Sequence, residues 1–101
     1  MPRASRIVAP GYPHYIMQRS NNRLQVFHDD DDRQHYLDLL DEYAQRFALK
    51  IWSYSLLADQ VHLLVLPADN LSLARGAGLA NQVYTQYFNR KYAHAGRLWQ
   101  N

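Results

Sequence analysis

Apolar and polar positions alternate with a period of two over His14–Arg19, which predicts a β-strand. Two further short runs, Ile51–Leu57 and Val61–Leu66, are rich in β-branched and aromatic residues. They flank Ala58-Asp59, so we expect the two runs to form a hairpin. Pro67 closes the second strand, because proline has no backbone N–H for the ladder.

A helical period replaces this alternation in two longer stretches, which predicts helices at about Asp30–Ala48 and Leu71–Tyr92. The aspartates at 29–32 suit a helix start, because carboxylates cap free backbone N–H groups and meet the positive end of the helix dipole. We prefer that structural role to a metal-binding one. Gly76 and Gly78 each cost about 1 kcal/mol inside a helix, so the first turns of the second helix should be loose or closely packed.

The predicted order is β-α-β-β-α, followed by the start of a further strand at Arg97–Asn101. This order predicts an α+β fold of the ferredoxin-like kind, with an antiparallel sheet and both helices on one face. We expect one domain over residues 1–101: an extended basic arm at 1–13 and a core at 14–101 that is incomplete at its C-terminus. An open sheet face with polar and aromatic side chains is a common platform for nucleic acid.

Composition narrows the class of protein. Hydrophobic residues make up 48% and charged residues 20% of the chain, a globular balance, and without cysteine there are neither disulfides nor thiolate metal sites. No uncharged stretch approaches the roughly 18 residues of a membrane helix, so we expect a soluble, cytoplasmic protein without a membrane partner.

Charge is unevenly distributed along the chain. Residues 29–42 hold seven of the nine acids, whereas the rest of the chain has ten basic residues against Asp59 and Asp69. Such segregation points to an anionic partner on the basic side. A mixed surface with a helix start matched to its dipole explains the same distribution, and charge alone leaves both interpretations open.

Gln60 and His62 are candidate metal ligands. Two residues apart on a strand, they should project from the same face. A pair of histidines at such positions suits a divalent metal that polarises a phosphate. An amide oxygen is a weaker ligand for Mg²⁺ or Mn²⁺, and a lone histidine in an apolar strand is more often structural.

The order of short segments along nearly the whole chain resembles the REP-associated tyrosine transposases, which are IS200-like members of the HUH single-strand transposases. The segments that carry the resemblance are Met1–Val8, Pro13–Tyr15, Gln18–Arg23, Val26-Phe27, Trp52–Leu56, Val61–Val65, Tyr84–Tyr92 and Gly96–Asn101.

The resemblance implies a protein that binds single-stranded or hairpin DNA and nicks it. In that family a tyrosine hydroxyl attacks a phosphodiester, assisted by Mg²⁺ or Mn²⁺ on the HUH histidines. This chain has Asp59-Gln60-Val61-His62 where the family has Asn-His-Val-His. The family's tyrosine lies on a helix beyond the strand that Leu98 begins, and the chain ends before it.

Tyrosines on the second helix are considered as substitutes for the missing nucleophile. Tyr84 and Tyr87 share the apolar stripe of that helix, which favours core packing. Tyr92, near the end of the helix, is expected to be exposed and is the candidate catalytic residue. A purely structural role for all three is the preferred interpretation.

Basic residues outside the acidic segment are the candidates for DNA contact, because arginine suits phosphates and guanine edges. They are Arg3, Arg6, Arg19, Arg23, Arg90, Lys91 and Arg97. The resemblance assigns the arm that holds the first two to DNA recognition.

Three hypotheses about function remain open from the sequence. The chain is a metal-dependent nickase with unusual ligands, a non-catalytic DNA-binding regulator or transposase remnant, or a ferredoxin-like domain that self-associates, for example as a homodimer. An unfinished sheet edge at residues 97–101 would favour the last of these.

Overall fold

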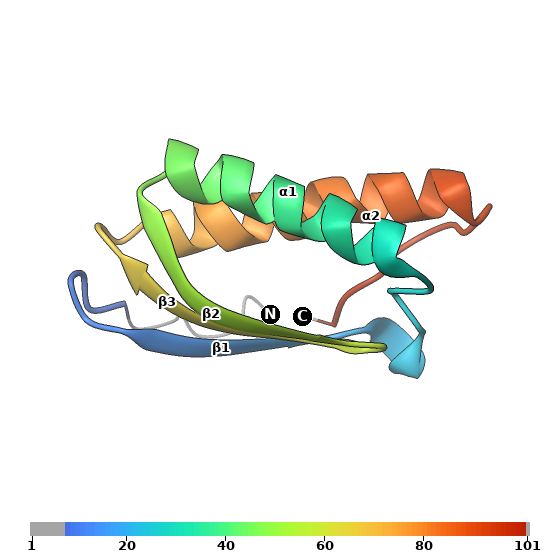
Figure 1. Cartoon of the computed structure of the whole chain (residues 1–101), viewed down its shortest axis with the longest axis horizontal. Coiled ribbons are helices and arrows are strands. Elements are labelled where there is room, and N and C mark those ends of the chain that lie inside the picture. Colours follow the sequence, from blue (N-terminus) through green and yellow to red (C-terminus); the bar gives the residue numbers. More distant parts are fainter. Residues whose placement is uncertain (1–7, 101) are drawn as a thin grey trace.

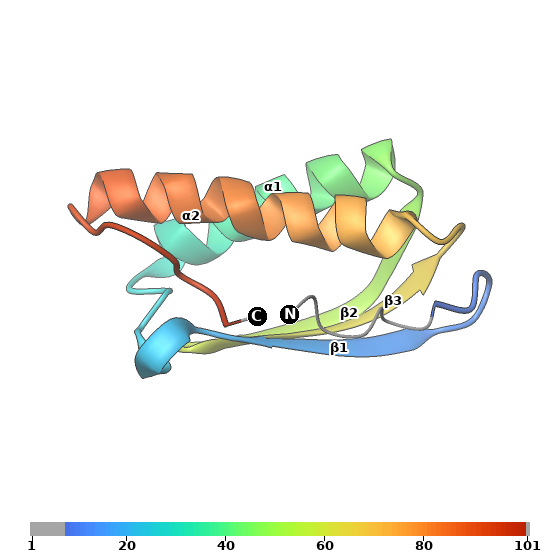
Figure 2. The ribbon, with the colours of Figure 1, turned by 180° about the vertical axis from the view of Figure 1, so that it is seen from behind.

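Two helices lie across one face of a three-stranded antiparallel sheet (Figures 1 and 2). The structure, a computed structural model, describes residues 8–100. The elements in chain order are β1 (His14–Arg19), the short 3-10 helix η1 (Asn21–Arg23), α1 (Asp30–Arg46), β2 (Leu49–Leu57), β3 (Gln60–Pro67), the π-helical segment η2 (Ala74–Gly78) and α2 (Leu79–Lys91). The α+β class and the placement of both helices on one face are confirmed.

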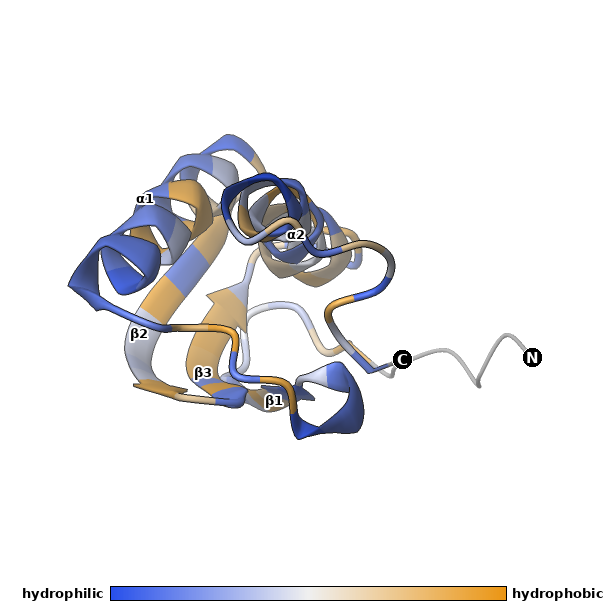
Figure 3. Cartoon of the chain, turned by 90° about the vertical axis from the view of Figure 1, so that its right-hand side faces the viewer, coloured by the Kyte–Doolittle hydropathy of each residue, from blue (hydrophilic) through white to orange (hydrophobic). Residues whose placement is uncertain are grey.

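β3 is the central strand, because the sheet order is β1-β3-β2. Val61, Leu63 and Val65 of β3 are buried beneath the helices, whereas the residues between them are half-buried on the opposite face. Both helices lie above the sheet and no element covers it from below within the described residues (Figure 3). The prediction that Gln60 and His62 share an uncovered face is therefore confirmed.

α1 begins with a side-chain cap, as the aspartate run predicts. Asp29 Oδ1 accepts a hydrogen bond from the backbone N–H of Asp32 at 2.8 Å. The helix ends two residues before the predicted boundary, because Phe47 is its C-cap and Ala48 adopts a left-handed φ of 57°. Every fourth residue of α1 from Asp32 to Ala44 is buried against the sheet and α2.

The second helix starts with a π-helical segment, and its glycines resolve the choice between loose and close packing. A Cβ atom on Gly76 would lie 2.9 Å from Leu49 Cδ2, so this glycine permits a close approach to β2. Gly78 has open space around the corresponding position. Close packing is thus correct at Gly76 only.

Both ends of the described chain differ from the predictions. Residues 8–13 form a turn instead of an extended arm, because Gly11 has a φ of 82° and Tyr12 N donates to Ala9 O. Arg97–Gln100 forms no strand: it makes one isolated bridge, Trp99 to Ser20, on the outer side of β1. The side chains of Leu98 and Trp99 are buried instead, which ties this segment to the core. Among residues 8–100 no helix has the length and apolar character needed to cross a membrane.

Candidate nucleic-acid interface

The uncovered face of the sheet is built by the alternate residues of each strand. The register aligns Arg19 with Gln60, Met17 with His62, and Tyr15 with Leu64. On the other side of β3, the register aligns Leu57, Ser55, Ser53 and Lys50 with Gln60, His62, Leu64 and Leu66. We call this surface the open face. It combines aliphatic, aromatic, amide, hydroxyl and cationic side chains, and none of the residues that the three strands align on it is acidic.

Three side chains form a hydrogen-bonded group at the centre of the open face, here called the His62 cluster: Tyr15, Gln60 and His62. The Tyr15 hydroxyl lies 2.5 Å from Nδ1 of the imidazole, and the Gln60 Oε1 lies 2.8 Å from its Nε2. The amide oxygen can only accept, so Nε2 donates to it, and in the neutral imidazole Nδ1 accepts from the hydroxyl. The Tyr15 ring also stacks on the imidazole, with 5.9 Å between the ring centroids.

The His62 cluster does not fit the Mg²⁺ or Mn²⁺ ion that the resemblance implies. Such ions prefer several oxygen ligands, carboxylates above all. The described part of the chain brings no three His, Cys, Asp or Glu side chains together in a way that could hold a metal. Because Tyr15 and Gln60 approach opposite ring nitrogens, a single ion at His62 can reach only one of them.

Two large aromatic side chains are available to a ligand at the sheet. Tyr15 is 63% exposed on the open face. Trp52 is 54% exposed and lies at a bulge of β2, where the register shifts between Ile51 and Ser53. A bulge re-aims a side chain and commonly lies beside a functional site.

The predicted DNA-contacting residues are scattered by the fold. Arg19 lies on the open face, aligned with Gln60, and Arg23 is exposed in η1, directly after β1. Arg90 is exposed near the end of α2, and Arg97 borders a groove beside Trp99, so neither belongs to the open face. Arg3 and Arg6 lie outside the described residues. Lys50, which the sequence did not single out, is exposed on the open face opposite Leu66.

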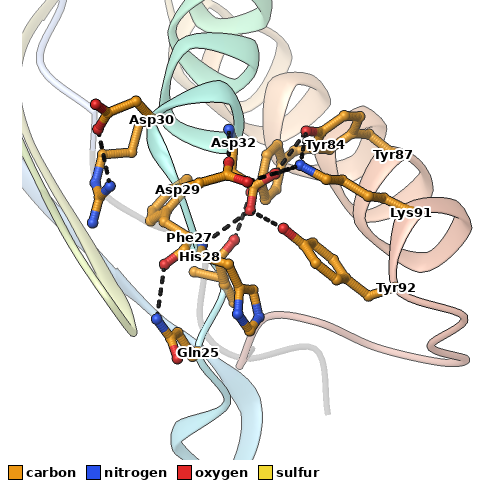
Figure 4. A network of polar contacts seen from close by, with 12 residues as sticks. Gln25, Phe27, His28, Asp29, Asp30, Asp32, Tyr84, Tyr87, Lys91 and Tyr92 are labelled. Atoms are coloured by element: carbon orange, nitrogen blue, oxygen red, sulfur yellow. Dashed lines mark hydrogen bonds and ion pairs between the residues drawn. The ribbon is translucent and has the colours of Figure 1, made fainter.

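Lys91, which is exposed, and Tyr92, which is half-buried, both belong to a polar network between the helices (Figure 4). Its centre is Asp32, whose side chain is fully buried. The carboxylate accepts from Lys91 Nζ at 2.8 Å, from the Tyr87 hydroxyl at 2.6 Å and from the Tyr92 hydroxyl at 2.5 Å. The backbone N–H of His28 adds a fourth hydrogen bond at 2.9 Å.

The protonation equilibria of this network argue against Tyr92 as a nucleophile. Burial raises the pKa of Tyr92 to about 12, and its hydrogen bond to Asp32 adds to the shift. Burial alone would raise the pKa of Asp32, but the hydrogen bonds from Lys91, Tyr87 and Tyr92 outweigh it and hold that pKa well below its usual range. The expectation that Tyr92 is exposed is wrong, because its side chain is half-buried with its hydroxyl on a carboxylate. Lys91 is paired with Asp32 but is also exposed, so its contact with DNA stays a prediction.

The core roles predicted for the other helix tyrosines agree with the structure. Tyr84 is buried and its hydroxyl donates to the backbone oxygen of Val26, while burial raises its pKa. Tyr87 is half-buried and donates to Asp32.

Sequence reasoning missed Tyr15 and Asp32. The Tyr15–His62 contact depends on the register between two strands 47 residues apart, which no local pattern specifies. For Asp32, by contrast, the sequence contains a sign of its buried position. Asp32 precedes Tyr36 by four residues and so lies on the inward stripe of α1, unlike its aspartate neighbours.

Comparison with known proteins places the chain among transposase-like sequences. The family model described as "Transposase IS200 like" matches residues 10–101. No curated protein matches the chain. A solved structure described as a putative transposase from Deinococcus radiodurans R1 superposes with a TM-score of 0.69 at 21% sequence identity, and the match covers 97% of this chain and 79% of that one. At this identity the likeness shows a shared fold.

Proposed function

Because the chain belongs to the IS200-like transposase family, we propose that it binds single-stranded or hairpin DNA on the open face of its sheet. The observation that carries the proposal is the make-up of that face. Tyr15 and Trp52 are exposed there or at its bulge, Arg19 and Lys50 supply positive charge, and no aligned residue is acidic. Unpaired bases stack on aromatic rings while cations follow the phosphates.

We also propose that nicking by the family's metal-dependent route is impaired in this chain. By its sequence resemblance, the chain has Gln60 where the family has the first HUH histidine. The Gln60 amide oxygen is hydrogen-bonded to His62. DNA binding without metal-dependent cleavage suits a regulator or a transposase remnant as well as a transposase domain.

Tryptophan fluorescence tests the DNA-binding proposal with a built-in control. The chain has two tryptophans. Trp52 is exposed and Trp99 is only 8% exposed. Titration with a hairpin oligonucleotide carrying single-stranded flanks should quench the Trp52 emission, because stacking on a base contributes about 1–3 kcal/mol. In Trp52→Phe the remaining Trp99 emission should not change, while fluorescence anisotropy of labelled DNA still reports binding.

Two outcomes would contradict the proposal. One is tighter binding to a blunt duplex than to the hairpin or the single strand. The other is no binding at low salt, combined with a dimer in solution. That result would favour self-association. One observation supports this alternative: within residues 8–100, the outer edge of β1 makes only one isolated β-bridge, at Ser20, and an unpaired strand edge can pair with a second copy of the chain.

A further inference from the structure

We infer that the His62 cluster is a nucleophilic site that works without a metal: Tyr15 attacks a DNA phosphodiester, His62 takes the proton, and Gln60 orients His62. The inference rests on the proposed binding of DNA to the open face and goes beyond it, because it assigns a reaction and the residues that perform it.

The hydrogen bonds of the cluster run from Tyr15 to His62 and from His62 to Gln60, which is the arrangement of an activated nucleophile. The structural sign of an activated hydroxyl is a base within hydrogen-bond distance of it. A third group in turn orients that base. Here the Tyr15 hydroxyl is 2.5 Å from His62 Nδ1, and His62 Nε2 is 2.8 Å from Gln60 Oε1. The accepting amide of Gln60 fixes the tautomer in which Nδ1 is free to receive the proton.

Tyr15 is distinguished from the other tyrosines by this contact together with its exposure. Four tyrosines donate their hydroxyls to other acceptors inside the molecule: Tyr36, Tyr84, Tyr87 and Tyr92. Tyr43 is partly buried against the core. Tyr12 and Tyr54 are exposed to a similar degree as Tyr15, but among the described residues neither hydroxyl is hydrogen-bonded to a base. A phosphate approaching the uncovered sheet can therefore meet an exposed hydroxyl that already has a proton acceptor.

Cations at both ends of the open face suit a strand of DNA that crosses the cluster. Arg19 is aligned with Gln60, and Lys50 is aligned with Leu66. Arg19 follows Tyr15 by four residues, about 13 Å along an extended strand. It therefore suits a flanking phosphate, which would hold the scissile one over Tyr15.

The proposed step is a transesterification whose atoms balance. A lone pair of the Tyr15 oxygen forms a bond to phosphorus while the hydroxyl proton passes to His62 Nδ1. The bond from phosphorus to one bridging oxygen breaks, and that oxygen keeps the electron pair. It takes a proton from water and becomes a free hydroxyl, and His62 returns its proton to solvent. The products are a phosphotyrosine link at Tyr15 and a DNA end with a free hydroxyl.

The experiment uses the whole chain and a labelled hairpin oligonucleotide first selected for binding, in EDTA and in Mn²⁺. A covalent adduct should form equally in both conditions and map to Tyr15 by mass spectrometry of the tryptic peptide. Tyr15→Phe keeps the ring and removes only the hydroxyl, so it should form no adduct even at DNA concentrations that saturate binding. The matched control is Tyr54→Phe, a similarly exposed tyrosine on the same sheet, which should behave like the unchanged chain.

The two other members of the cluster have separable effects. His62→Phe should lower the rate of adduct formation on the order of 10²-fold, the usual contribution of a general base. Gln60→Ala should lower it less, and Gln60→Glu should restore it, because a carboxylate also accepts from Nε2. A merely structural role of Gln60 would give no such rescue.

A DNA-free measurement keeps the inference testable on its own. An aryl sulfonyl fluoride should label Tyr15 faster than Tyr54, and His62→Phe should remove the difference. Equal labelling rates in the unchanged chain would overturn the inference, as would an adduct that requires Mn²⁺ or maps to another residue. Normal DNA binding with no adduct would overturn the inference and leave the proposed function standing, whereas loss of binding would remove both.

Discussion

A single buried carboxylate, Asp32, joins the start of α1 to the end of α2. It accepts hydrogen bonds from Lys91, Tyr87 and Tyr92, and the first of these is also an ion pair. Removing one partner of a buried charge pair leaves the other groups without compensation. The network therefore fixes how the two helices meet above the sheet.

We expect Asp32→Ala to lower the free energy of unfolding by about 3 kcal/mol, at the low end for a buried pair because Lys91 remains partly exposed. Urea denaturation at neutral pH measures the change. The matched control is Asp31→Ala, an exposed acid in the same turn, which should change stability by less than about 0.5 kcal/mol. Equal effects of the two substitutions would show that only the helix dipole is involved.

The same residue should make stability depend on pH in the acid range. The pKa of Asp32 is lowered in the folded state, so its contribution is present above the pKa of the unfolded chain, about 4, and is lost as pH falls towards the folded value. Below pH 4 the unchanged chain should lose stability more steeply than Asp32→Asn. Parallel curves in thermal unfolding from pH 5 to 2 would contradict the assignment.

At the scale of elements, the second helix is continuous but not uniform. Its first turns adopt π-helical geometry at η2, where Gly76 faces the side chain of Leu49. A side chain at Gly76 would come within 2.9 Å of Leu49 Cδ2 and within 3.2 Å of its Cβ. The glycine that weakens the helix locally is therefore the one that lets it approach β2.

Substituting alanine at the two glycines should have opposite effects. Gly78→Ala should raise the free energy of unfolding by up to about 1 kcal/mol, because alanine is the better helix former and nothing lies within 4 Å of the new Cβ. Gly76→Ala should instead lower it by about 1–3 kcal/mol through overpacking against Leu49. Chemical denaturation of both variants decides the matter: a stabilising Gly76→Ala would show that the contact with β2 relaxes without cost.

Periodicity was sufficient to predict the three strands and the two helices, their order and which face of β3 is buried. The bounds of β1 were predicted to the residue, and the shared face of Gln60 and His62 followed from the period of two. Contacts between elements were not predictable, because register and helix packing depend on residues far apart in sequence. The His62 cluster and the Asp32 network are both of this kind, and so is the single bridge of Trp99 where a strand was expected.

At the scale of the whole molecule, the fold places the acidic α1 and the cations of the open face on opposite sides of the sheet. The acidic segment forms the start and outer side of α1, where Arg33 and Arg46 pair with acids of the same helix. The open face lies on the opposite side of the sheet and carries Arg19 and Lys50. A polyanion is therefore repelled by the acidic side of α1 and attracted to the open face, although the net charge is only +2.

This arrangement predicts which arginine governs the salt dependence of DNA binding. For single strands the logarithm of the binding constant falls with the logarithm of salt concentration by about 0.7 per phosphate neutralised. Arg19→Ala should weaken binding and reduce that slope by about 0.7. Arg46→Ala removes the same charge from α1, where Arg46 is paired with Glu42, and should leave the slope unchanged. Anisotropy titrations of one labelled oligonucleotide at several salt concentrations give both slopes. If the two substitutions altered the slope equally, DNA would respond to net charge alone and the open face would not be its binding surface.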